Sequence, residues 1–126
     1  MLQMYSAAFE NNKGKNLTPL AVNGAYSSAH PALSKDGKTL YFASDKLGGY
    51  GGTDIYISAR NANGVWSDPQ NLGPEVNSAF DEKFPFLAQD GTLYFSSNSP
   101  SGLGGLDIYK TKAENGHWLK PENLGA

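Results

Sequence analysis

The sequence contains no cysteine, and this absence removes several kinds of site at once. Disulfide bridges, thiolate zinc sites and cysteine nucleophiles are all excluded. No apolar run approaches the roughly 18 residues of a membrane span, so we expect no direct membrane insertion. The N-terminal stretch MLQMYSAAFENNKGK lacks a basic segment followed by an apolar one and is not a signal peptide. The chain is therefore expected to be either a protein that is not exported or a mature or trimmed piece of one that is.

An excess of charge of one sign is also lacking. The 126 residues include 10 basic and 12 acidic side chains, which gives a formal net charge of −2. We therefore expect no nucleic-acid partner, because such binding relies on a basic surface. Hydrophobic residues make up 39% of the chain, which is enough for a core and excludes a wholly disordered protein. The length allows one ordinary domain.

The strongest pattern in the sequence is an internal repeat. The segment 31–73 returns as 85–125, with about twenty identical positions. The shared motifs are Asp-Gly followed by Thr-Leu-Tyr-Phe, a Gly-rich stretch ending in Asp-Ile-Tyr, and Trp-x-x-Pro-x-Asn-Leu-Gly. A weaker trace covers residues 16–26, and residues 2–9 echo the strand around Ile55. The sequence therefore predicts two full repeats preceded by the back half of a third.

Each repeat has the pattern of short antiparallel strands. Alternating or aromatic runs are separated by turn pairs such as Asp36-Gly37 and Asn63-Gly64. No segment shows an apolar period of 3.6, so helices should be few. Four short strands in about 40 to 55 residues form the unit of a β-propeller. We predict an all-β chain of about two and a half four-stranded antiparallel blades: a partial blade and connection in 1–30, a blade in 31–76 and a blade in 77–126, together one partial propeller domain.

These motifs, taken in order over about residues 16 to 126, resemble the PD40 repeat, a WD40-like propeller repeat of the TolB type. The closest resemblance is to the form of this repeat in OmpA-family envelope proteins of Bacteroidetes-type bacteria. The resemblance implies a non-catalytic scaffold that is periplasmic or associated with the outer membrane. Such propellers usually have about six blades, and they often accompany a peptidoglycan-binding domain that this sequence does not contain.

The repeated polar and aromatic residues are best explained as structural. A blade needs a turn-fixing carboxylate and a packing aromatic in every copy, whereas an active site is needed once. The two histidines are isolated, and no Gly-x-Ser-x-Gly nucleophile motif is present. We therefore predict no enzymatic activity, no cofactor and no metal site. The residues interpreted as structural are Asp36, Asp54, Trp66, Asp90, Asp107 and Trp118.

Residues that the repeat does not share are better candidates for binding. Asp81 and Glu82, in the connection between the two repeats, are candidates for holding a cation or a ligand amine. Asp45, Lys46 and Tyr50 lie in or beside the first Gly-rich loop, where a propeller meets its ligands. The alternative in each case is a solvated surface side chain. A phosphate-binding loop is disfavoured because a strand, not a helix, follows each Gly-rich stretch.

Two and a half blades do not close a ring of four to eight. The chain is therefore expected to be part of a longer propeller, to assemble with copies of itself (three chains would give about six blades), or to have an open architecture. The leading functional hypothesis is a scaffold that binds protein partners or further blades in the bacterial envelope. The alternative is a lectin-like propeller that binds a glycan or small ligand through its mouth loops.

Overall fold

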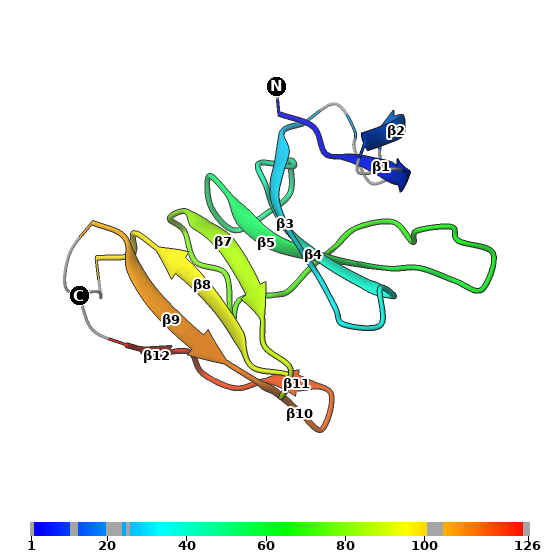
Figure 1. Ribbon diagram of the computed structural model, residues 1–126. Coiled ribbons are helices and arrows are strands. Elements are labelled where there is room, and N and C mark those ends of the chain that lie inside the picture. The colour runs from blue at the N-terminus through cyan, green and yellow to red at the C-terminus, as the bar shows by residue number, and fades with distance from the viewer. Residues whose placement is uncertain (1, 11–12, 20–23, 25, 101–104, 125–126) are drawn as a thin grey trace.

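The computed structural model shows an all-β chain built on two four-stranded antiparallel sheets (Figure 1). It describes every residue except 1, 11–12, 20–23, 25, 101–104 and 125–126, so most of the second Gly-rich stretch and part of the 16–26 trace lie outside the described residues. None of the described residues is helical, and the described part of the chain therefore offers no helix able to cross a membrane.

Each large sheet has the strand order of a propeller blade, which confirms the predicted fold class. Blade 1 has the order β3-β4-β5-β6, and blade 2 has the order β7-β8-β9-β12. Blade 1 consists of β3 (Ser28–Leu33), β4 (Thr39–Ser44), β5 (Asp54–Ala59) and β6 (Gln70–Asn71). Blade 2 consists of β7 (Glu82–Leu87), β8 (Leu93–Ser97), β9 (Asp107–Thr111) and β12 (Glu122–Asn123). Two further hairpins pair β1 (Tyr5–Glu10) with β2 (Lys13–Pro19) and β10 (Ala113–Glu114) with β11 (His117–Trp118).

The two blades match even in their irregularities. The turns before β4 and β8 use Gly37 and Gly91 at φ of 73° and 89°, as the Asp-Gly pairs predict. The first strand of each blade contains a register shift, and at that point His30 and Phe84 adopt left-handed φ of 53° and 52°. Their rings stack at a centroid distance of 4.0 Å. The first strands of the two blades therefore meet directly, side by side.

Two hydrophobic clusters lie on opposite faces of blade 1, because alternate residues of β4 and β5 point to opposite sides of the sheet. On one face Tyr41, Ala43 and Ile55 pack against Leu93 and Phe95 of blade 2. On the other face Leu40, Phe42 and Tyr56 pack against Met4, with Trp66 at the margin. Blade 1 is thus covered on both sides.

Within the part of the chain that the structure describes, blade 2 is covered on one face only. The repeat aligns Tyr41, Ile55 and Leu72 of blade 1 with Tyr94, Ile108 and Leu124 of blade 2. The blade 1 residues are 7%, 0% and 9% exposed, whereas Ile108 and Leu124 are 50% and 49% exposed. Phe86, which pairs with Tyr94 across the strands, is 62% exposed. We call this surface the open face of blade 2, and it consists of Phe86, Tyr94, Ile108 and Leu124.

The chain passes from blade 1 to blade 2 through a connector, residues 73–81, that is bound tightly to β5. The Asn77 side chain accepts a hydrogen bond from the Ile55 N–H (2.7 Å) and donates one to the Ile55 carbonyl (3.0 Å). It also donates to Asn71 Oδ1 at 2.7 Å. Farther along, the backbone of 78–80 lies so close to Gly51 that a side chain there would collide with the Phe80 carbonyl. The contact between the connector and blade 1 therefore requires both the side-chain amide of Asn77 and the lack of a side chain at Gly51.

We predict that Asn77→Ala lowers the free energy of unfolding by about 1–3 kcal/mol, because it leaves the buried Ile55 N–H without this partner and removes one of the hydrogen bonds to the Ile55 carbonyl and to Asn71 Oδ1. Urea unfolding followed by circular dichroism measures the change. The control is Asn63→Ala in an exposed loop, for which a change below about 0.5 kcal/mol is expected. Equal effects of the two variants would contradict the role assigned to Asn77.

Candidate functional site

The candidate residues of the first Gly-rich loop are mostly occupied by contacts within the chain. Asp45 Oδ1 accepts the Ser27 N–H at 2.7 Å, and Lys46 Nζ lies 5.0 Å from the centroid of the Tyr26 ring. Tyr50 donates its N–H to Asp54 Oδ2 at 2.6 Å while its side chain stays 50% exposed. Asp45 and Lys46 thus hold the segment that leads into β3. Tyr50 presents its ring to solvent.

Asp81 and Glu82 do not form a common site, because neighbouring residues at the start of β7 point to opposite sides. Asp81 contacts Asn98, whose Oδ1 accepts the Asp81 N–H at 2.8 Å. Glu82 is fully buried, and its carboxylate accepts three hydrogen bonds. The donors are the Ser78 N–H (2.7 Å), the Ser78 hydroxyl (2.6 Å) and the Ser97 hydroxyl (2.7 Å). No group of three or more His, Asp or Glu side chains in the described residues is arranged to hold a metal ion.

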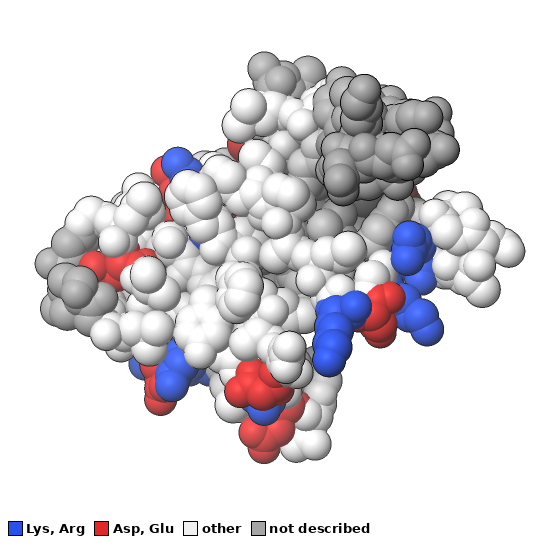
Figure 2. All heavy atoms as spheres, viewed as in Figure 1, with Lys and Arg blue, Asp and Glu red and all other residues white. Residues whose placement is uncertain are grey.

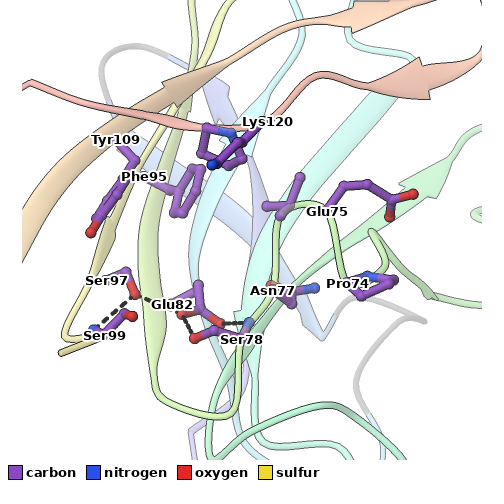
Figure 3. A pocket seen from close by; sticks show the side chains of 12 residues that line it. Pro74, Glu75, Asn77, Ser78, Glu82, Phe95, Ser97, Ser99, Tyr109 and Lys120 are labelled. Atoms are coloured by element: carbon purple, nitrogen blue, oxygen red, sulfur yellow. Dashed lines mark hydrogen bonds between the residues drawn. The ribbon is translucent and has the colours of Figure 1, made fainter. Parts of the chain in front are cut away.

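Glu82 instead lines a cavity of about 400 Å³ between the connector and blade 2 (Figure 3). Glu82, Ser97 and Ser99 form one side of the cavity, and Phe95, Tyr109 and Lys120 lie across from them. The Phe95 and Tyr109 rings stack at 5.8 Å. The buried Tyr109 hydroxyl has no hydrogen-bond partner among the described residues. An aromatic wall with a few converging polar groups suits a small polar ligand.

Sequence reasoning missed this cavity because half of its lining belongs to the repeat. Ser97 and Tyr109 match Ser44 and Tyr56 of blade 1 and therefore look structural. The one signal was Glu82, which stands where blade 1 has the buried Ser28.

The repeated aspartates before Ile-Tyr occupy the same place in both blades. Asp54 is 1% exposed, and its Oδ2 accepts hydrogen bonds from the Tyr50 N–H and from Asn71 Nδ2 at 3.0 Å. Asp107 is 2% exposed, and Asn123 Nδ2 donates to it at 3.4 Å. Both carboxylates therefore tie the start of the third strand to the fourth strand.

The two tryptophans each pack toward the preceding unit of the chain. Trp118, on the β10-β11 hairpin, meets Tyr41 of blade 1 edge to face at 6.1 Å. Trp66 packs against the cluster that contains Met4, and the Arg60 guanidinium lies 5.5 Å from its ring centroid. Both residues thus contribute to packing between neighbouring units.

Asp36 and Asp90 hold the turns between the first and second strands. Asp36 Oδ1 accepts hydrogen bonds from the Ser34 hydroxyl (2.6 Å) and the Lys38 N–H (3.0 Å). Asp90 Oδ1 accepts the Thr92 N–H at 2.9 Å. The bond from Ser34, followed by that from Lys38, lowers the pKa of Asp36, and the bonds from Thr92 lower the pKa of Asp90.

We predict that these two turns make the fold sensitive to acid. A carboxyl whose pKa is lower in the folded state stabilises the fold above its unfolded pKa, and this stabilisation is lost as the pH falls through the folded pKa. The free energy of unfolding of the Asp36→Asn, Asp90→Asn double variant should therefore fall less than that of the parent protein as the pH is lowered from about 6 to about 2. Urea midpoints across this range measure the effect, with the exposed Asp68→Asn as control. An unchanged slope in the double variant would contradict the prediction.

Comparison with known proteins identifies the fold. No protein-family model and no curated protein matches the chain. Among solved structures, the crystal structure of TolB from Acinetobacter baumannii matches with a TM-score of 0.57 at 17% identity and covers 94% of this chain. The match covers 26% of the TolB chain, so this chain spans about a quarter of that protein's length. At this identity the similarity concerns the fold alone, and it shows that the two sheets are TolB-like propeller blades.

Proposed function

We propose that the chain is a non-catalytic propeller module that binds protein through the open face of blade 2. The observation that carries this proposal is the exposure of Ile108 and Leu124, whose equivalents in blade 1 are buried. Contiguous exposed apolar side chains on a soluble protein usually mark a contact surface. In the view of Figure 2, the surface over β7, β8 and β9 is largely uncharged, and charges of both signs lie along the lower rim. An apolar protein surface is the partner that such a face accepts.

The repetition of the polar residues supports a non-catalytic role. Asp54 and Asp107 are buried and bonded to the fourth strand of their blades, and Asp36 and Asp90 are bonded within turns. A catalytic carboxylate must be free to bind substrate, and one such site is sufficient. These carboxylates instead make equivalent structural hydrogen bonds in both blades.

The cellular place of this module is proposed from resemblance. The sequence motifs resemble the PD40 repeat of OmpA-family envelope proteins, and the blades have a TolB-like fold. Both observations support a periplasmic or outer-membrane-associated scaffold.

A photo-reactive amino acid placed at position 108, in cells that make the protein, tests the proposal. We expect ultraviolet light to join the Ile108-substituted chain to a protein in the envelope fraction, because the open face lies against a partner there. The same amino acid in place of Leu47, which is 94% exposed but outside the open face, should give no such adduct. Absence of a protein adduct at position 108 would contradict the proposal.

The cavity beside Glu82 supports a second candidate function, the binding of a small polar ligand such as a sugar. The specific observation is the buried Tyr109 hydroxyl, which has no partner among the described residues and lines the same cavity as Glu82. A ligand that hydrogen-bonds to it would complete the site.

We predict that a binding monosaccharide in a screened panel raises the melting temperature, and that Tyr109→Phe reduces this rise. Differential scanning fluorimetry measures both effects. Tyr50→Phe is the matched control, because Tyr50 lies in the mouth loop rather than in the cavity. A rise that Tyr50→Phe removes would place the site at the mouth, and no rise with any sugar would eliminate the candidate.

A further inference from the structure

We infer that the chain associates head to tail with copies of itself, and that the open face of blade 2 in one copy replaces residues 2–4 on blade 1 of the next. We call residues 2–4 the N-terminal cap. The inference rests on the proposed function and names the partner of the same surface. It depends on four comparisons between equivalent positions of the repeat.

The cap makes the same backbone hydrogen bond as Thr53, the residue directly before β5. The Ser28 N–H donates to the Leu2 carbonyl at 2.8 Å, and the Glu82 N–H donates to the Thr53 carbonyl at 2.8 Å. Ser28 and Glu82 are equivalent residues of the repeat. Leu2 therefore stands on blade 1 where Thr53 stands on blade 2.

The cap also makes the same packing contact as β5. Two positions after Leu2, Met4 is 4% exposed and packs against Leu40, Phe42 and Tyr56. Two positions after Thr53, Ile55 is fully buried against Leu93 and Phe95, the equivalents of Leu40 and Phe42. The cap thus imitates the beginning of the third strand of a preceding blade.

The third strand of blade 2, β9, is the equivalent of β5, and its apolar side chain on the open face is exposed to solvent. Leu106 and Ile108 of blade 2 are the equivalents of Thr53 and Ile55, and they are 52% and 50% exposed. In the equivalent loop of blade 1, a side chain at Gly52 would come within 2.5 Å of Asp81 Oδ1 in the connector. At the equivalent Gly105, no atom of the described residues lies within 4 Å of the position that a side chain would take. A glycine at position 105 therefore leaves space for the residue of a following blade that would be equivalent to Asp81.

The face that the cap covers and the open face are therefore the two halves of one interface, which the chain already forms between its own blades. The cap covers blade 1 with a short segment in which Leu2 remains 60% exposed, whereas blade 2 offers an apolar sheet face. Lys110 also lies on that face, where Glu122 pairs with it at 3.7 Å. Because the interface is heterologous, it closes when the rotation between units completes a circle. With two full blades in each copy, three copies give about six blades.

Disulfide cross-linking between two single-cysteine proteins tests this arrangement, because the parent chain has no cysteine. Thr53 pairs directly with Asp81 between the blades, and their equivalents across the inferred interface are Leu106 of one copy and Ser27 of the next. We expect a mixture of Leu106→Cys and Ser27→Cys proteins to form a mixed disulfide about tenfold faster than a mixture of Leu47→Cys and Ser27→Cys.

A second substitution keeps the test decisive. Ile108→Asp, added to the Leu106→Cys protein, should return the rate of disulfide formation to that of the control, because it places a charge in the interface between copies. The Ile108 side chain is half exposed within one copy, so the substitution should leave the fold of that copy intact. Cross-linking no faster than the control, or unaffected by Ile108→Asp, would overturn the inference. If position 108 then captures a different protein in cells, the proposed function stands without self-association, and if it captures none, both fail.

Discussion

Burial of the apolar faces of each sheet between neighbouring sheets is the constraint on which this structure depends. A four-stranded blade has residues pointing to both sides, so each blade needs a cover on each side. Blade 1 has both covers, one from Leu93 and Phe95 and one from Met4. Blade 2 has one, and its other side leaves Ile108 half exposed. Comparison of the two repeats therefore shows that the open face of blade 2 lacks a cover. The equivalent face of blade 1 is covered by the next sheet, through Leu93 and Phe95.

The polar contacts fix how one blade meets the next. Asn77 binds both backbone groups of Ile55, and the Thr53 carbonyl accepts the Glu82 N–H. These bonds set the distance and the angle between the sheets, because they join the connector to the third strand before the next blade begins. The buried carboxylate of Glu82 adds three further bonds in a place where blade 1 has only Ser28. Glu82 thereby lines the cavity between the connector and blade 2.

The sequence was sufficient to predict the blades because their strands, Asp-Gly turns and aromatic pairs are local signals that occur twice. It did not show that Asp45 binds Ser27 or that Glu82 is buried, because both depend on contacts between segments far apart in the chain and on the register shift in each first strand. The sequence indicated that residues 2–9 echo the strand around Ile55, but it did not show that Leu2 and Met4 contact blade 1, because that contact joins segments far apart in the chain. The hydrogen bond from Ser28 and the burial of Met4 revealed it.

The most direct test of this account is the mass of the native particle measured by light scattering over a wide range of protein concentration. A chain of 13.5 kDa that uses its open face on copies of itself should approach three times that mass, about 40 kDa, as the concentration rises. The particle should then stop growing, because a closed ring has no free face. A folded chain that keeps the mass of one copy at every concentration would contradict the account.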